Sequence, residues 1–302
     1  MKNINWSELG FGYFKTDYNV RCEYKDGKWG ELYATEDVNM NIHMASTCLH
    51  YGQEVFEGLK AFRGADGKVR LFRVEENAKR MINSGEYLKM AVPSVELFTK
   101  ACIEAVKLNA DYIPPYGSGA SLYLRPMLIG VGPQVGVKPS ADYLFAVFVT
   151  PVGPYYKDGF NCIKVIIDYD HDRAAPKGTG HVKVGGNYAA SLDSGEIAHQ
   201  KGFASVIFLD PATKQYIDEC SAANFFGIRD GKYITPDSHS VLPSITNKSL
   251  RQIAEDLGLK VEQRKVGVEE LPTFSEAGCC GTAAVISPIG SVYDPKTDKT
   301  IV

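Results

Sequence analysis

Apolar residues recur along this chain at two spacings, and each spacing predicts a different kind of element. A repeat of three to four positions, typical of amphipathic helices, runs through residues 74–85, 93–110 and 244–261. Ser94 is placed to cap the second of these helices, and Gly258 to close the third. The residues expected to face inward on the third helix are Leu250, Ile253, Ala254 and Leu257.

Strands are predicted where apolar and polar residues alternate, or where a short apolar run is bounded by turn residues. Within residues 121–131, Leu122 and Leu124 point to one face, so Tyr123 and Arg125 share the other. A hairpin turn is expected at Asp230-Gly231 and a tight loop at residues 278–281. Further strands are predicted at residues 67–72, 143–153, 162–170, 204–210 and 283–292.

The regular pattern breaks at residues 150–159, where two prolines and two glycines fall close together. A chain of 302 residues is long enough for two hydrophobic cores. We therefore expect a small N-terminal α/β domain over residues 1–150, an interdomain loop over 151–160, and a large C-terminal domain over 161–302. The expected fold class is mixed, α+β or α/β.

Composition narrows the classes of function. A formal net charge of -3, without any local cluster of basic residues, excludes a nucleic-acid footprint. No apolar run reaches the roughly 18 residues that a membrane span needs, so we expect neither a membrane partner nor a location outside the cytoplasm. The seven cysteines are scattered and odd in number, which favours a reducing compartment, and none has zinc-site spacing. No metal is expected.

Lys183 stands in an unusual setting, between Val182 and Val184 and just before Gly185 and Gly186. Its apolar neighbours predict a short strand-like step, and the paired glycines let another group approach the backbone. An amine with few water neighbours becomes nucleophilic toward an aldehyde. Pyridoxal phosphate is the natural aldehyde, so Lys183 is a candidate for a Schiff base with it.

Such a cofactor also needs groups for its phosphate, its pyridine nitrogen and its 3-hydroxyl. Asp218 and Glu219 end a predicted strand, and alternation lets only one of the two point into a site. The phenol of Tyr188 is placed to bond the 3-hydroxyl. The backbone amides that could hold the phosphate belong to a helix start and to a small-residue loop, namely Ser244, Ile245 and Thr246, and Gly281, Thr282 and Ala283.

Together, "HYGQEVFEGLKAFRG", "LFRVEENAKRM", "LYLRP", "HVKVGGNYAASL", "YIDECSAANFFGI", "LPSITNKSLRQIA" and "GTAAVISPI" resemble the branched-chain amino acid aminotransferases, which are fold-type IV pyridoxal-phosphate enzymes. The resemblance implies the D-amino acid aminotransferase-like fold, in which the C-terminal domain, here residues 161–302, binds the cofactor at the interface of the two domains. It also implies pyridoxal 5'-phosphate as cofactor and a homodimer or higher homo-oligomer. The implied reaction moves the amino group of leucine, isoleucine or valine to 2-oxoglutarate, giving branched-chain 2-oxo acids and L-glutamate.

The resemblance carries roles onto individual positions. Lys183 would form the Schiff base and shuttle the α-proton, while Glu219, rather than Asp218, would meet the pyridine nitrogen. Tyr188 would bond the 3-hydroxyl, and Arg125 would pair the distal carboxylate of glutamate. The remaining implied cofactor-binding positions are Arg80, Arg173, Ile245, Thr246 and Thr282. The implied substrate-binding positions are Tyr51, Phe56, Tyr123, Arg125, Tyr155, Thr282 and Ala283.

Several alternatives stay open at the level of the sequence. Members of the resembled family usually continue beyond the segment that matches "DPKTDKTIV", so the C-terminal domain is expected to be shortened if the chain ends at Val302. D-amino acid transaminases and aminodeoxychorismate lyases share the lysine, acid and threonine segments. A protein that keeps pyridoxal phosphate without catalysis is the alternative of another class.

Overall fold

The computed structural model describes residues 2, 4–155 and 161–301. Contacts along the chain divide it into two units: unit 1 is Met1–Tyr155 with Lys183–Gly185, and unit 2 is Tyr156–Val182 with Gly186–Val302. The interdomain loop expected at residues 151–160 falls partly outside the described residues, and its described start still belongs to a strand. The short segment Lys183–Gly185 packs with unit 1, although the predicted domain limits place it in the C-terminal domain.

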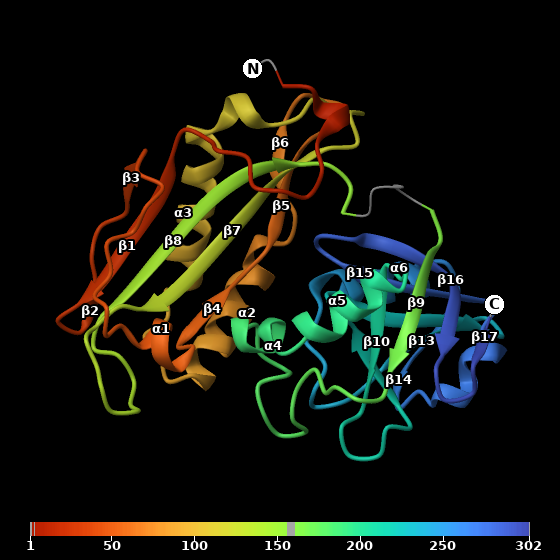
Figure 1. The fold of residues 1–302 in the computed structure, drawn as a ribbon. Helices are drawn as coiled ribbons and strands as arrows, with labels where there is room; N and C mark the ends of the chain where they lie inside the picture. Colours follow the sequence, from red (N-terminus) through yellow and green to blue (C-terminus); the bar gives the residue numbers. More distant parts are fainter. Residues whose placement is uncertain (1, 3, 156–160, 302) are drawn as a thin grey trace. The chain divides into compact units, whose positions relative to one another are not determined.

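Unit 1 is built on an eight-stranded sheet whose main path runs β2-β1-β8-β7-β5-β6, with β3 paired to β1 and β4 paired to β7. Figure 1 shows β7 and β8 as long neighbouring arrows, and they pair antiparallel over their full length. The strands are β1 (Asn19–Lys25), β2 (Lys28–Trp29), β3 (Tyr33–Thr35), β4 (Glu54–Phe56), β5 (Leu59–Arg63), β6 (Val69–Leu71), β7 (Ser121–Gly130) and β8 (Tyr143–Val152).

Two amphipathic helices, α2 (Val74–Tyr87) and α3 (Val95–Leu108), pack on each other, and α3 packs against β8 and β1. Both helices agree with the prediction from apolar spacing, and the Ser94 cap is confirmed, because its Oγ accepts from the Leu97 N–H at 3.1 Å. The described short elements of unit 1 are the helix α1 (Thr47–Tyr51) and the 3-10 turns η1 (Trp6–Glu8) and η2 (Ala110–Tyr112).

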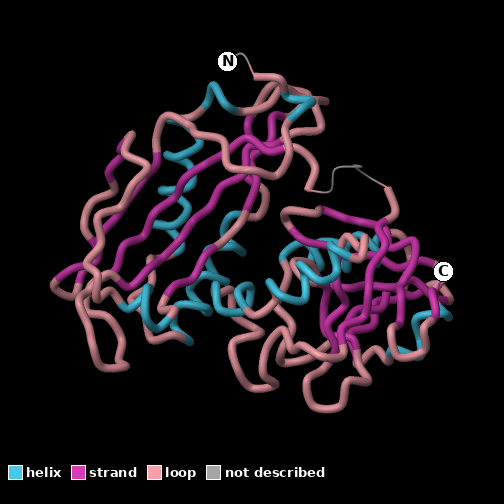
Figure 2. The backbone as a smooth tube through the Cα atoms, in the orientation of Figure 1, coloured by secondary structure: helices cyan, strands magenta, loops and turns pink. Residues whose placement is uncertain are grey.

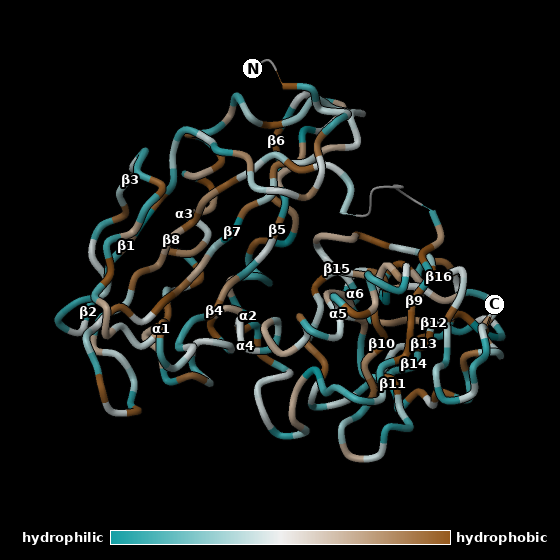
Figure 3. Tube along the Cα trace, viewed as in Figure 1, coloured by the Kyte–Doolittle hydropathy of each residue, from teal (hydrophilic) through white to brown (hydrophobic). Residues whose placement is uncertain are grey.

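Unit 2 is built on a nine-stranded mixed sheet with the order β11-β10-β9-β16-β15-β12-β13-β14, and β17 pairs with β16. The parallel neighbours β9 and β10 are mostly apolar, as the largely brown tube in Figure 3 shows, and all five residues of β10 are buried. The strands are β9 (Ile163–Asp168), β10 (Ser205–Leu209), β11 (Ile217–Cys220), β12 (Asn224–Arg229), β13 (Lys232–Pro236), β14 (Lys260–Arg264), β15 (Glu276–Gly281), β16 (Val285–Asp294) and β17 (Lys299–Ile301).

The helices of unit 2 are short, as the cyan segments of Figure 2 show. The predicted hairpin is confirmed between β12 and β13, where Asp230 and Gly231 both have positive φ, at 50° and 69°. The helices are α4 (Gly185–Ala189, whose first residue belongs to unit 1), α5 (Leu192–Gln200) and α6 (Ile245–Asp256), with the 3-10 turn η3 (Val268–Thr273). Among the described residues, no helix has the length and hydrophobicity needed to cross a membrane.

The predicted inward face of α6 is wrong in part. Ala254 is buried, but Ile253 is 50% exposed and Leu257 is 75% exposed. The helix instead buries Asn247, whose amide donates a hydrogen bond to the Thr235 hydroxyl at 2.9 Å. A hydrophobic pattern does not register a buried asparagine, because hydrogen bonds rather than apolar surface make its burial favourable.

The loop predicted at residues 278–281 is also wrong, because these residues form the end of β15. Cys279 and Cys280 are both fully buried in the sheet. Gly278 lies there for a packing reason, since a Cβ at this position would come within 2.6 Å of the Phe226 ring. The turn prediction depended on the glycines, but at least one of them accommodates an aromatic ring instead.

Candidate functional site

The Lys183 segment is attached to unit 1 through its backbone. The Lys183 N–H donates to Ser84 Oγ at 2.9 Å, and the Phe56 N–H donates to the Lys183 carbonyl at 3.2 Å. The Gly185 N–H donates to a carboxylate oxygen of Glu54. The Lys183 side chain is half-buried, and its Nζ lies 4.4 Å from the centre of the Phe56 ring. The predicted strand-like step is wrong, because residues 182–184 form no strand and α4 begins at Gly185.

On β7, Tyr123 and Arg125 share a face of the sheet, as alternation predicted, and their side chains touch. Arg125 Nη2 donates to the Tyr123 hydroxyl at 3.1 Å. The guanidinium carbon of Arg125 also lies 4.9 Å from the centre of the Phe56 ring, so Phe56 contacts both this arginine and Lys183. Four candidates of the sequence, Phe56, Tyr123, Arg125 and Lys183, are thus brought together within unit 1.

An aromatic residue that sequence reasoning missed also joins this group. The ring of Phe11 packs edge-on against Tyr123 and Tyr155, with centroid separations of 5.1 and 5.2 Å. The segment is held by the Gly153 N–H, which donates to the Gly10 carbonyl at 3.1 Å. The glycines around Phe11 in "GFGYF" were a weak signal, because periodicity does not single out a residue in an irregular segment.

Tyr51 and Arg80 have other partners in unit 1. Tyr51 is 40% exposed, and its hydroxyl donates to the Val135 carbonyl. Arg80, on α2, forms a two-pronged ion pair with the fully buried Glu57, through Nε at 2.7 Å and Nη2 at 2.8 Å. Asn77 donates to the same carboxylate at 2.7 Å. A planar arginine held by two parallel hydrogen bonds has a fixed orientation, which an anion-binding residue requires.

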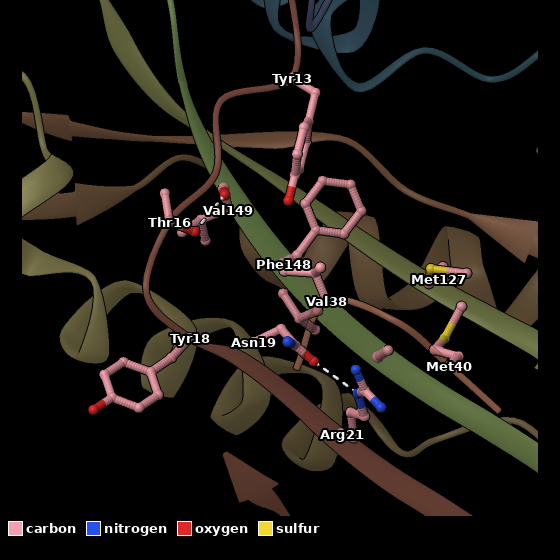
Figure 4. A pocket seen from close by; sticks show the side chains of 12 residues that line it. Tyr13, Thr16, Tyr18, Asn19, Arg21, Val38, Met40, Met127, Phe148 and Val149 are labelled. Carbon is pink, nitrogen blue, oxygen red and sulfur yellow. Dashed lines mark hydrogen bonds between the residues drawn. The ribbon is translucent and has the colours of Figure 1, made fainter. Parts of the chain in front are cut away.

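The unit 1 sheet also has a cavity of about 300 Å³ near β1 and β8. Figure 4 shows its lining, in which Arg21 reaches back to Asn19 through a hydrogen bond of 2.7 Å. Among the described lining residues, Arg21 is the only charged one, and none is a predicted site residue. The rest of the lining is mostly apolar or aromatic, including Tyr13, Met127 and Phe148, and the described lining holds no carboxylate or histidine.

In unit 2, the carboxylates of Glu219 and Asp218 are both buried, and they differ in their hydrogen-bond partners. The Glu219 carboxylate accepts three contacts: Arg173 Nη2 at 2.5 Å, the Asn224 amide at 2.8 Å and the Leu242 N–H at 3.2 Å. Burial raises the pKa of Glu219, and these three donors oppose the rise. Asp218 is buried as well, but its Oδ1 has no hydrogen-bond partner among the described residues, and burial raises the pKa of its carboxyl. The three donors hold the Glu219 carboxylate in a fixed orientation, which would suit a further hydrogen bond to a ligand.

Arg173 joins three segments of unit 2. Besides the ion pair with Glu219, its Nη2 donates to the Gly180 carbonyl at 2.8 Å and to the Ser240 carbonyl. Gly180 is required here, because a Cβ would overlap the Ser240 backbone. One buried guanidinium therefore links β11, the segment before Lys183 and the loop before α6.

A buried polar network that sequence reasoning missed extends from Glu219 to α6. Asn247 Nδ2 donates to the Asn224 oxygen at 3.3 Å, and the Tyr233 hydroxyl donates to the Asn247 oxygen at 2.8 Å. These side chains are at most 6% exposed. No sequence rule would have found them, since polar residues at irregular spacing give no periodic signal.

The phosphate candidates lie at the start of α6 and after β15. Ser244 caps the helix, accepting from the Asn247 N–H at 3.1 Å, so the N–H groups of Ile245 and Thr246 have no partner inside the helix. Thr282 and Ala283 form the turn between β15 and β16, and α6 packs against β15. Tyr188 is half-buried in α4. Unit 2 therefore supplies a buried carboxylate, a phenol, and a helix N-terminus whose N–H groups suit an anion.

Comparisons with known proteins identify the family of the chain. The family profile "Amino-transferase class IV" matches residues 54–292. The branched-chain-amino-acid aminotransferase of Haemophilus influenzae is 52% identical over 299 residues, covering 97% of this chain and 87% of that protein. The solved branched-chain amino acid aminotransferase of Escherichia coli has a TM-score of 0.77 at 29% identity, covering 92% of this chain and 87% of its own.

A third match includes a ligand. The T.th. branched-chain amino acid aminotransferase complexed with N-(5'-phosphopyridoxyl)-L-glutamate has a TM-score of 0.75 at 27% identity, over 93% of this chain and 87% of that one. These similarities confirm the mixed, two-domain fold expected from the sequence. The chain belongs to the class IV aminotransferases and, among them, to the branched-chain-amino-acid aminotransferases.

Proposed function

We propose that this chain is a pyridoxal-phosphate-dependent transaminase that moves the amino group of L-leucine, L-isoleucine or L-valine to 2-oxoglutarate. The products are the branched-chain 2-oxo acids and L-glutamate. The observation that carries the proposal is the arrangement in unit 1, where the Lys183 amine lies over Phe56 and the same ring contacts Arg125. An amine, an apolar ring and a guanidinium side by side suit a substrate that is either aliphatic or dicarboxylic.

The donor chemistry of each unit fits pyridoxal phosphate. When bound, this cofactor supplies a ring that withdraws electrons from the bond being broken. Lys183 would hold the cofactor through its amine, and Nζ, once released, would carry the substrate's α-proton. Glu219 would keep a proton on the pyridine nitrogen, because its orientation and charge are maintained by Arg173 and Asn224.

The remaining cofactor-binding roles belong to groups that hold anions or hydroxyls. Tyr188 would bond the 3-hydroxyl. The positions assigned to the phosphate are Arg80, Ile245, Thr246 and Thr282. Arg173 would act behind Glu219 as a support. A helix start with N–H groups unpaired inside the helix and a fixed arginine both favour a phosphate.

The substrate pocket would combine aromatic walls with one arginine. Phe56, Tyr123 and Tyr155, with Tyr51, would contact the aliphatic chain, and Arg125 would pair the distal carboxylate of glutamate. The amides of Thr282 and Ala283 would take the α-carboxylate. The contact of Arg125 with Tyr123 supports this assignment, because the tyrosine holds the guanidinium on the face of the sheet that carries Phe56.

The chain would act as a homodimer or a higher homo-oligomer in the cytoplasm. In support of assembly, Met44, Leu49, Val135 and Val137 are between 58% and 86% exposed. They lie near one another, because the Gln134 N–H donates to the Ala45 carbonyl at 2.9 Å. Exposed apolar groups clustered in this way are typical of protein interfaces. The odd number of scattered cysteines supports a reducing compartment.

The test incubates the purified chain with pyridoxal phosphate, 2-oxoglutarate and one amino donor, and measures L-glutamate. L-leucine should react and D-alanine should not. Lys183→Ala should lose turnover by at least about a thousandfold and keep its circular dichroism spectrum. Reaction with D-alanine in place of L-leucine would refute the substrate class, and full activity of Lys183→Ala would refute the role of the lysine.

A further inference from the structure

The carboxylate of Glu54 lies beside the Lys183 segment and has no role in the assignments above. One of its oxygens accepts the N–H of Gly185, two residues after Lys183. Gly185 is adapted to this contact, because a Cβ at its position would overlap the carboxylate. The glycine that the sequence suggested would make room for a cofactor therefore makes room for Glu54.

The strand β4 directs Glu54 toward this segment. Successive side chains of a strand point to opposite faces, and the middle residue, Val55, is fully buried in the core. Glu54 and Phe56 consequently share the other face. β4 contacts the segment twice, since the Phe56 N–H donates to the Lys183 carbonyl and Glu54 receives the Gly185 N–H. One short strand thus fixes the backbone on both sides of Val184.

The charge of Glu54 acts on the same neighbours. Burial raises the pKa of the Glu54 carboxyl, whereas the Gly185 N–H and the positive charges of Lys183 and Arg125 oppose that rise. The thiol of Cys48, on α1, also lies within the field of this carboxylate. Among the described residues, two cations, one hydrogen-bond donor and the Cys48 thiol interact with the Glu54 carboxylate.

We propose that Glu54 is a positioning residue for Lys183, which anchors the lysine segment through Gly185 and supplies a negative charge beside the amine. This inference rests on the proposed function, because it concerns the lysine that would hold the cofactor. The anchor keeps the backbone at residues 183–185 on β4. The charge favours the protonated amine, so it should raise the pH at which Lys183 becomes reactive.

Two substitutions separate the anchor from the charge. Glu54→Gln keeps an oxygen that can accept the Gly185 N–H and removes the charge, whereas Glu54→Ala removes both. The matched control is Glu104→Gln, on the exposed side of α3. The readout is the rate at which the cofactor-free protein binds added pyridoxal phosphate, measured by visible absorption at several pH values. Borohydride reduction followed by peptide mapping then tests whether the cofactor is attached to Lys183.

Glu54→Gln should capture the cofactor as fast as the unmodified protein at its own optimum, with the midpoint of the pH dependence about one unit lower. Glu54→Ala should show a similar shift and, in addition, about a tenfold slower capture, because the segment loses its anchor. Glu104→Gln should match the unmodified protein. An unshifted midpoint in Glu54→Gln, or equal capture rates in the two variants, overturns the proposal.

A second pair of variants keeps the test decisive if Glu54→Ala folds poorly. Gly185→Ala places a Cβ against the carboxylate and should slow capture about tenfold. The double variant with Glu54→Ala removes this overlap, so its loss should be smaller than the product of the two single losses. If the loss in the double variant equals the product of the two single losses, the anchoring role of Glu54 is overturned. If the unmodified protein captures no cofactor on Lys183, the proposed function itself fails, which is distinct from capture that Glu54 does not influence.

Discussion

Arg173 and Glu219 form an ion pair of 2.5 Å in which both side chains are at most 7% exposed. Removing one partner of such a pair leaves an uncompensated charge in the interior, which costs about 3 to 5 kcal/mol. The same guanidinium also holds the carbonyls of Gly180 and Ser240, so its loss would leave these acceptors without a donor.

We therefore predict that Arg173→Met lowers the free energy of unfolding of the cofactor-free protein by about 3 kcal/mol or more. The double variant Arg173→Met with Glu219→Leu should lose less, because no charge is then left unpaired. Denaturant unfolding at constant pH measures both. A loss below about 1 kcal/mol in the single variant would show that the pair contributes little.

Arg125 should discriminate between the two kinds of substrate. Arg125→Leu removes the guanidinium expected to pair a distal carboxylate, so the KM for L-glutamate should rise about tenfold or more. The KM for L-leucine should change by less than about threefold, since an aliphatic chain has no charge to pair. The matched control is Arg70→Leu, an exposed arginine of the same unit, which should change neither value. Equal effects on both substrates would contradict the assigned role.

Gly58 should be intolerant of a side chain because of Tyr123. A Cβ at Gly58 would overlap the Tyr123 hydroxyl, so Gly58→Ala should lower the free energy of unfolding by about 1 to 3 kcal/mol. Adding Tyr123→Phe removes the hydroxyl and should restore part of this loss. Gly195→Ala, in α5 with open space around it, serves as the control and should leave stability unchanged or slightly higher. Thermal or denaturant unfolding compares the four proteins.

Glu270 should contribute stability that depends on pH. Arg264 lies 2.8 Å from its carboxylate and holds the pKa of Glu270 down at about 2. A carboxyl whose pKa is lowered in the folded state stabilises the protein at pH values above its unfolded-state pKa of about 4.3. This contribution disappears as the pH falls toward 2. Glu270→Gln should thus cost about 2 kcal/mol at pH 7 and almost nothing near pH 2.

The control for this prediction is Glu255→Gln, on the exposed side of α6, which should have little effect at either pH. Unfolding curves collected at several pH values provide the measurement. A difference between Glu270→Gln and the unmodified protein that persists at low pH would contradict the ion-pair origin of the stabilisation.

Periodic features of the fold could be predicted from the sequence, and irregular ones could not. Alternation placed Tyr123 and Arg125 on one face of β7, and their hydrogen bond confirms that reasoning. The failure at α6 arose because Asn247 takes a buried position that a hydrophobic pattern assigns to an apolar residue. Phe11 was missed for a related reason, since it belongs to no regular element.

In the candidate site, the residues of the motifs could be predicted from the sequence, and the residues that support them could not. Motif positions such as Lys183 and Glu219 stood out in the sequence, and both have fixed surroundings in the structure. The supports around them did not stand out, because Asn224 reaches Glu219 across the irregular connection between β11 and β12, and Glu54 reaches Gly185 through a tertiary contact. Spacing along the chain carries no information about partners 131 residues apart.

Because Lys183–Gly185 packs with unit 1, dividing the chain at the proline- and glycine-rich stretch would separate this segment from the strand that binds it. A fragment ending at Tyr155 would leave the Phe56 amide and the Glu54 carboxylate without the backbone groups that occupy them in the whole chain. The complementary fragment would retain the reactive amine and lack the strand on which it rests. Restoring the lysine's surroundings would therefore require both pieces to reassemble, not just one of them to fold.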